Sequence, residues 1–317
     1  MRTGAAAGHI GYYHEAVCYD SAEHLLGVVV PFLLDGIEAG EPSIVALGEL
    51  NAALVRSALP ADSKVVFLTG GEMYARPATA IRSYRKLLAD HVSEGAAQIR
   101  IIGEVTSRAL GPTWDWWARY ESAINHAYDE FPLWSMCAYD VRVTPGAVLD
   151  DVLRTHPRTA LPDGSHPPNR QYIDPVGYLS VPRPPVPDPV QLTGPRADLT
   201  DPTPAEARLA VHAAGTGLLS ADDLDDLVVA ASETVTNARR HGRGPIRMRL
   251  WTAGDRVVIT VTDAGRGPRD PFAGLLPGTN DNGGGLGLWI THQSCSHVSL
   301  DRGPDGFTVR LTGGVPL

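Results

Sequence analysis

The chain has 317 residues with a formal net charge of -9 at pH 7, and its length predicts two domains, each large enough for its own hydrophobic core. The negative charge argues against nonspecific nucleic-acid binding, which needs clustered Lys and Arg. Lys64 and Lys86 are the only lysines, which excludes a Gly-Lys-Ser/Thr phosphate-binding loop anywhere in the chain.

The first half alternates short β-branched segments with helical ones. Helices are expected at 21–39, 50–59, 78–94, 114–131 and 145–155, and strands at 43–47, 65–68, 99–104 and 134–140. This alternation is typical of βαβ units, so we expect an α/β domain with a mostly parallel sheet.

Two carboxylates, Glu104 and Asp140, follow expected strands of this sheet. Ligands bind at such strand ends in open α/β sheets, but a carboxylate there can equally cap the next turn or helix. The histidines His14, His24 and His156 show no i, i+4 metal-ligand spacing, and we interpret each as a hydrogen-bonded structural residue.

A set of residues in this half resembles the MEDS sensory domain, a relative of RecA-like ATPases. The resemblance rests on Phe32-Leu33, Gly36, Gly40-Glu41, Gly103-Glu104, Trp117, Tyr120-Glu121, Cys137, Tyr139-Asp140 and His156-Pro157. It implies a RecA-like fold for residues 1–175. Since no phosphate-binding loop follows the first strand, we expect this domain to sense or dock and not to hydrolyse ATP.

The spacing of the cysteines and the length of the apolar segments bear on where in the cell the protein is expected. Cys18, Cys137 and Cys295 are far apart and form no CxxC motif, so we expect reduced thiols and no zinc site. The N-terminus lacks the continuous apolar segment of a secretory signal. The longest apolar run, 25–34, contains Pro31 and is far shorter than the roughly 20 residues of a transmembrane helix. We expect a cytoplasmic protein with no membrane span.

Residues 176–202 are expected to form a linker. Prolines are dense from 157 to 189, and such segments favour extended, semi-rigid conformations without core periodicity.

The remaining residues, 203–317, predict a second domain. Thr203 and Pro204 begin a helix, and a longer helix at 221–241 carries an apolar stripe and ends at Gly242, as helices commonly do. Strands are expected at 245–252, 256–262, 297–300 and 306–311, with an irregular segment at 268–282 that is long enough to act as a lid.

Three motifs of this domain carry candidate chemistry. Glu233 and Asn237 are one helical turn apart and share a face. The segment Asp263-Ala264-Gly265-Arg266-Gly267 follows a strand and offers a hydrogen-bond acceptor beside a backbone that a ligand can approach. Finally, Gly283-Gly284-Gly285-Leu286-Gly287 leads into a helix whose N-terminal N–H groups suit a phosphate.

In this order, the motifs resemble the GHKL ATP-binding fold of gyrase, Hsp90, histidine kinases and the anti-sigma-factor serine kinases, over roughly 203–311. The resemblance implies a two-layer α+β (Bergerat) domain. It further implies that Asn237 ligates Mg²⁺, Glu233 acts as the base and Asp263 binds adenine. The implied nucleotide pocket consists of Gly265, Gly267, Gly283, Gly285, Leu286 and Gly287.

The segment from Ser232 to Gly242 looks most like the anti-sigma serine kinases. That resemblance implies an ATP-dependent protein serine kinase that phosphorylates a STAS-type anti-anti-sigma partner and sequesters a sigma factor, gated by the sensory domain. It also implies a possible homodimer and no direct contact with nucleic acid. The alternative is a non-catalytic, ATP-gated module that sequesters a transcription regulator. A histidine kinase would need an acceptor histidine on a helical hairpin, but a proline-rich segment stands there, and a gyrase- or Hsp90-like motor would need transducer domains.

Overall fold

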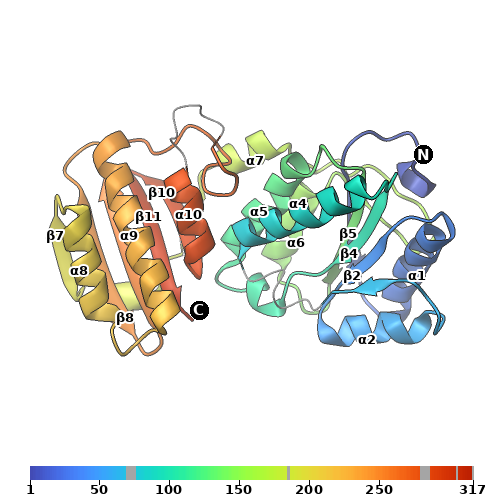
Figure 1. Cartoon of the computed structure of the whole chain (residues 1–317), viewed down its shortest axis with the longest axis horizontal. Helices are drawn as coiled ribbons and strands as arrows, with labels where there is room; N and C mark the ends of the chain where they lie inside the picture. Colours follow the sequence, from blue (N-terminus) through green and yellow to red (C-terminus); the bar gives the residue numbers. More distant parts are fainter. Residues whose placement is uncertain (69–75, 184–185, 279–285, 305, 316–317) are drawn as a thin grey trace. The chain divides into compact units, whose positions relative to one another are not determined.

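The computed structural model describes residues 1–317 except 69–75, 184–185, 279–285, 305 and 316–317 (Figure 1). The chain forms two compact units. One comprises Met1–Ala75 and Thr79–Tyr178, and the other comprises Arg76–Ala78 and Leu179–Leu317. Among the described helices, none combines the length and apolar character needed to cross a bilayer.

The N-terminal unit is an α/β domain. Within its described residues, six strands form one parallel sheet in the order β3-β2-β4-β5-β1-β6, which confirms the predicted fold class. The strands are β1 (Tyr13–Tyr19), β2 (Ser43–Ala46), β3 (Val66–Phe67), β4 (Ile99–Gly103), β5 (Leu133–Asp140) and β6 (Arg158–Thr159).

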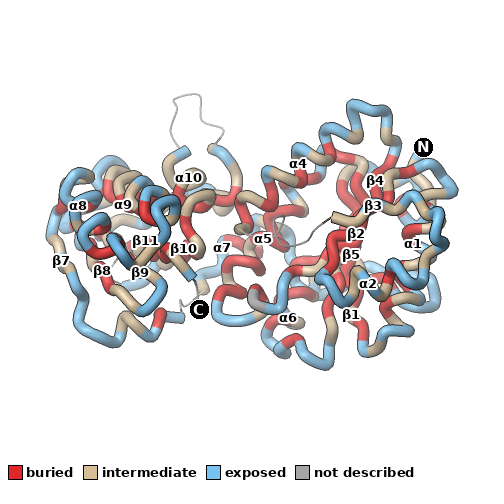
Figure 2. The backbone as a smooth tube through the Cα atoms, turned by 60° about the horizontal axis from the view of Figure 1, so that its bottom comes forward, coloured by how far each residue is buried: buried red, intermediate tan, exposed pale blue. Residues whose placement is uncertain are grey.

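Helices cover both faces of this sheet. They are η1 (Gly4–Ala6), α1 (Ala22–Glu38), α2 (Glu49–Ala58), α4 (Pro77–Ser93), η2 (Ser107–Leu110), α5 (Trp114–Ala127), α6 (Gly146–Thr155) and α7 (Pro175–Ser180). Helices α1 and α2 pack on one face, around a core that includes Leu25, Phe32, Val45 and Met136, while α4, α5 and α6 cover the other (Figure 1). Because both faces are covered, the central strands are almost entirely buried (Figure 2).

Strand β1 lies between β5 and β6, yet the sequence analysis did not predict it. Its sequence, Tyr-His-Glu-Ala-Val-Cys-Tyr, carries polar side chains that are buried. Glu15 is fully buried because it accepts a hydrogen bond from Trp134 Nε1 at 2.7 Å and pairs with His166 Nδ1 at 2.9 Å. Partners on other elements therefore explain a strand that hydrophobic periodicity alone does not indicate.

The C-terminal unit is a two-layer α+β domain, as predicted. Its described strands form an antiparallel sheet in the order β10-β11-β9-β8-β7. Three helices lie along one face of this sheet (Figure 1). The elements are η3 (Pro189–Leu192), β7 (Ala197–Thr200), α8 (Pro204–Gly215), α9 (Ala221–His241), β8 (Arg247–Ala253), β9 (Arg256–Asp263), α10 (Leu286–Ser294), β10 (His297–Gly303) and β11 (Gly306–Gly314).

The proline-rich segment is more structured than a spacer. Asp188 pairs with Arg256 of β9 at 2.9 Å, and Arg310 of β11 donates to the carbonyl of Val186 at 2.6 Å. Trp251 Nε1 of β8 donates to the carbonyl of Thr193 at 3.1 Å. Arg310 lies between residues of β11 that face the helices, so its side chain points to the other face of the sheet. The proline-rich segment that it contacts therefore covers the face opposite the helices.

The end of the predicted linker also belongs to the sheet, because β7 pairs with β8 as its edge strand. Residues 186–202 of the predicted linker therefore contact or join the sheet of the C-terminal unit. Proline density indicates an extended backbone, but it does not reveal side chains of the sheet that hold the segment in place.

Candidate functional site

Helix α9 carries both Glu233 and Asn237, the carboxylate and the amide of the predicted site. Ser220 caps its N-terminus by accepting from the Asp223 N–H at 3.1 Å, and Leu227, Ala231 and Val235 are buried toward the sheet. Glu233 and Asn237 are half-buried on successive turns. Within the described part of the chain, neither side chain makes a hydrogen bond, so both can interact with a ligand.

The start of α10 lies directly against this pair. A methyl group added at Gly287 would lie 2.7 Å from Glu233 Oε2 and 3.1 Å from Asn237 Nδ2. Any side chain at this position would therefore displace the carboxylate or the amide. The structure thus brings together Glu233, Asn237 and Gly287, with the N-terminus of a helix beside a carboxylate and an amide.

Asp263 ends β9 and is buried, and it lies beside two glycines. Its Oδ1 accepts the backbone N–H of Gly265 at 2.7 Å and of Arg243 at 3.1 Å. No described residue donates a hydrogen bond to Oδ2. The carboxylate is held in one orientation, with one oxygen remaining as an acceptor.

Gly242 ends α9, as the sequence predicts, and its backbone is extended. Its φ is -81° and its ψ is -168°, which is extended backbone. Glycine is needed because an added methyl group would lie 2.4 Å from the Asp263 carboxyl carbon. At Gly265 an added methyl would lie 2.5 Å from Asp263 Oδ1, so both glycines make room for this carboxylate.

Gly267 has a different requirement. Its φ of +68° is in the left-handed region, and an added methyl group would lie 2.4 Å from the buried ring of Phe307. Of the predicted glycine motif before α10, Gly283 and Gly285 lie outside the described residues. Leu286 is exposed as the first residue of the helix, and Gly287 follows it.

The strand-end carboxylates of the N-terminal unit have structural partners. Glu104 Oε2 accepts the Gly48 N–H at 3.0 Å, at the N-terminus of α2, and also accepts from Asn51 Nδ2. Asp140 Oδ1 accepts the Arg142 N–H at 2.9 Å. Both cap a helix or turn, which confirms the structural interpretation of the two.

The N-terminal unit also buries a group of four polar side chains, His14, Glu121, Cys137 and His156. Burial lowers the pKa of His14 well below its ordinary value, with His156 lowering it further, and burial lowers the pKa of His156 to about 4. Burial raises the pKa of Glu121 to about 7, although Tyr139 and Cys137 donate hydrogen bonds to it. The pKa of Cys137 is raised by burial and by Glu121. In the protein alone, burial therefore favours the uncharged form of all four groups.

The sequence analysis did not group these four residues. Neighbouring members of the group are separated by 16, 19 and 107 positions in the sequence, so no local spacing could indicate them.

A half-buried carboxylate and amide beside a helix N-terminus, on a two-layer α+β domain, are features of a nucleotide-binding protein. Two family models match the chain in agreement with this class. Residues 13–157 match the MEDS family, described as the methanogen/methylotroph, DcmR sensory domain, and residues 196–313 match the histidine kinase-like ATPase domain. The chain therefore carries a MEDS domain followed by a histidine kinase-like ATPase domain of the GHKL fold. The second family implies ATP binding, usually with Mg²⁺.

Among solved structures, the chain is similar to the RsbU and RsbW domains of Rv1364c from Mycobacterium tuberculosis. The identity is 25% over 38% of this chain and 32% of that chain, with a TM-score of 0.27, so the match spans about a third of that chain. Another is the histidine kinase domain of the E. coli osmosensor EnvZ, at 19% identity over 39% of this chain and 92% of that chain, with a TM-score of 0.24. No curated protein matches the chain.

Proposed function

We propose that the C-terminal domain binds Mg-ATP between α9 and the start of α10 and transfers the γ-phosphoryl group to a serine of a partner protein. The observation that supports this most directly is the close approach of Gly287 to Glu233 and Asn237. Phosphoryl transfer depends chiefly on positioning and charge stabilisation, and this approach puts a helix N-terminus, a metal-binding amide and a candidate base together.

Each residue has a distinct proposed role. Asn237 would supply an oxygen ligand to a Mg²⁺ ion, and that ion would offset the negative charge of the ATP phosphates. Glu233, one turn earlier, accepts the proton of the attacking hydroxyl. Asp263 accepts a hydrogen bond from the adenine amino group through Oδ2, because Oδ1 is already engaged by two backbone N–H groups.

The glycines shape the pocket around these side chains. Gly265 and Gly267 let the backbone after β9 approach the base, and Gly287 lets the start of α10 approach the phosphates. Gly283, Gly285 and Leu286 complete the proposed phosphate-binding turn. Since the domain has no lysine, the ion and backbone N–H groups together with arginines must balance the phosphate charge.

The proposed partner follows from the segment Ser232 to Gly242, which resembles the anti-sigma serine kinases. The acceptor serine belongs to a STAS-type anti-anti-sigma protein, and the same surface sequesters a sigma factor when that partner is absent. The MEDS domain gates this exchange in the cytoplasm, and a homodimer formed through the ATPase domain is part of the proposal.

Incubation with γ-labelled ATP, Mg²⁺ and recombinant STAS-domain anti-anti-sigma proteins tests the transfer. We expect label on the partner's serine and none on its Ser→Ala variant. Nucleotide-dependent capture of the partner without label would instead establish the non-catalytic binding module. Folded protein that neither binds ATP nor labels a partner would contradict both functions.

A further inference from the structure

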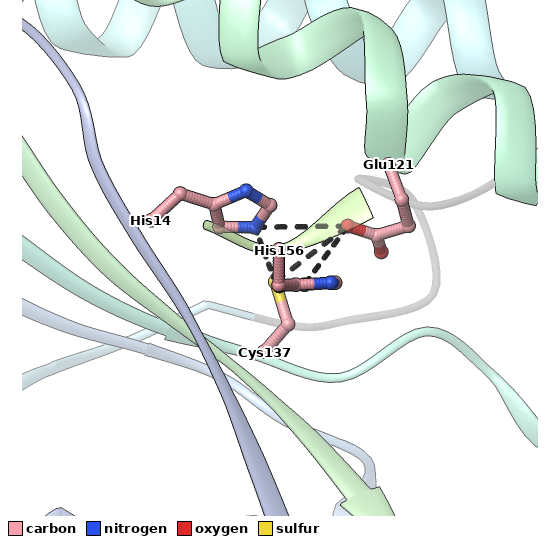
Figure 3. A group of neighbouring side chains, drawn as sticks. All are labelled: His14, Glu121, Cys137 and His156. Carbon is pink, nitrogen blue, oxygen red and sulfur yellow. Dashed lines mark hydrogen bonds and ion pairs between the residues drawn. The ribbon is translucent and has the colours of Figure 1, made fainter. Parts of the chain in front are cut away.

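The buried group in the N-terminal unit has the geometry of a ligand set. His14 of β1, Glu121 of α5, Cys137 of β5 and His156 at the end of α6 point toward one another (Figure 3). His14 Nε2 lies 3.4 Å from Cys137 Sγ and 3.8 Å from Glu121 Oε2. Glu121 Oε2 lies 3.5 Å from His156 Nε2 and 3.8 Å from Cys137 Sγ. All four donor atoms lie within 4.8 Å of one another.

Hydrogen bonds outside the group orient both imidazoles. His156 Nδ1 lies 2.8 Å from the Val152 carbonyl, so Nδ1 carries the proton and the Nε2 lone pair faces the group. His14 Nδ1 lies 3.0 Å from Asn125 Oδ1, which is an acceptor because Asn125 Nδ2 donates to the carbonyls of Glu121 and Thr155. His14 Nε2 is therefore also a lone pair directed inward.

The carboxylate is fixed in the same manner. Tyr139 donates to Glu121 Oε1 at 3.0 Å, which leaves Oε2 to face the two histidines and the thiol. Second-shell hydrogen bonds of this kind hold metal ligands in proteins.

Hydrogen bonding does not account for the burial of one of the proposed ligand atoms, His156 Nε2. His156 is fully buried, and its Nε2 has no hydrogen-bond partner in the described part of the chain. Buried polar atoms are ordinarily satisfied, and an inward lone pair beside a thiol, a second imidazole and a carboxylate suits a cation.

We propose that His14, Glu121, Cys137 and His156 bind one divalent metal ion of the zinc class in the MEDS domain. Zinc bonds of roughly 2.0–2.3 Å in tetrahedral geometry separate neighbouring donor atoms by about 3.3–3.6 Å. Of the four distances given above, two fall within this range and two are longer, and the remaining two donor pairs lie within 4.8 Å, so side-chain rotations that draw the donor atoms together would close the site.

The net charge of the resulting complex also favours a divalent ion of the zinc class. A divalent ion bound by a thiolate, a carboxylate and two neutral imidazoles is a complex of zero net charge. Such a complex can be buried without an uncompensated charge. Mixed nitrogen, sulfur and oxygen donors suit Zn²⁺, whereas Mg²⁺ and Ca²⁺ prefer oxygen alone. On binding, the Cys137 thiol and the protonated fraction of the Glu121 carboxyl give up their protons to solvent.

A cavity of about 20 Å³ has Cys137 in its wall, together with Tyr12, Tyr84, Tyr120 and Tyr128. This space holds about one water molecule. It gives a small ligand a place beside Cys137, one of the proposed metal ligands.

Cobalt titration of the full-length chain, stripped with a chelator and kept reduced, tests the proposal. We expect one equivalent of Co²⁺ to give the intense visible bands of tetrahedral cobalt and a sulfur-to-cobalt charge-transfer band, both removed by Zn²⁺. Folded protein that gives no such spectrum would overturn the proposal.

Variants locate the ion. Cys137→Ser should lose the charge-transfer band, whereas Cys18→Ser, a cysteine of β1 outside the group, should keep it. Tyr139→Phe keeps all four ligands and should weaken cobalt affinity about 10- to 100-fold through loss of the hydrogen bond to Glu121. A charge-transfer band that persists in Cys137→Ser, or an unchanged affinity in Tyr139→Phe, would show that the metal lies elsewhere.

Discussion

Replacing Asp188 with alanine tests whether the proline-rich segment is part of the ATPase domain. The Asp188 carboxylate accepts two hydrogen bonds from Arg256, at 2.9 and 3.1 Å, and one from the Val190 N–H at 2.9 Å. The side chains of Asp188 and Arg256 are only 8% and 14% exposed. Removing Asp188 leaves the nearly buried guanidinium with only the exposed Asp255, 3.6 Å from Arg256 Nη1, as a counter-ion, which costs up to about 3 kcal/mol.

Calorimetry of the full chain measures this loss as a lower midpoint for the transition of the ATPase domain. For a domain of this size the shift should be roughly 10 °C. Asp198→Ala is the matched control, because Asp198 also pairs with a sheet arginine, Arg247, but the two side chains are 33% and 52% exposed. Exposed ion pairs contribute little, so the control should unfold like the wild type. Equal midpoints for the two variants would refute the packing argument.

The pairing of Asp188 with Arg256 also predicts that the stability of the ATPase domain depends on pH. Burial raises the pKa of Asp188, but hydrogen bonds from Arg256 and Val190 outweigh this and leave it below its ordinary value. A carboxyl whose pKa is lower in the folded state stabilises above its unfolded pKa of about 3.9. The difference between wild type and Asp188→Ala should therefore be full near neutral pH and shrink as the pH falls below about 4.

Three further substitutions probe the nucleotide site and its surroundings. Asn237→Ala should abolish Mg²⁺-dependent ATP binding in calorimetry, and unchanged binding would remove Asn237 from the metal. Glu233→Gln should bind ATP normally but transfer at least 100-fold more slowly, and full transfer activity would rule out its role as base. Gly267→Ala should lower the unfolding midpoint more than Gly217→Ala, since both have positive φ but only Gly267 faces a ring, that of Phe307. Equal unfolding midpoints for these two glycine variants would show that the positive φ alone, and not the contact with Phe307, determines the loss of stability.

Sequence patterns predicted the elements whose stabilisation is local. Helix α9 was predicted at its observed bounds, Ala221–His241, because its cap, apolar stripe and terminal glycine are all encoded within it. Strands β8 and β9 were predicted for similar reasons, with a turn between two β-branched segments.

Elements that depend on distant partners were missed. β1 buries Glu15 against Trp134 and His166, and β7 follows a proline-rich segment that Arg256 and Trp251 hold against the sheet. The group at His14 and Cys137 was missed for the same reason. These residues share a face of neighbouring strands, but only the register of β1 with β5 brings them together.

Isothermal titration calorimetry of the full chain with ATP and Mg²⁺ measures whether the C-terminal domain binds the nucleotide as proposed. We expect a saturable heat for one nucleotide per ATPase domain, which is lost when Mg²⁺ is chelated and is absent in Asn237→Ala. Folded protein that gives no heat with ATP and Mg²⁺ would contradict it.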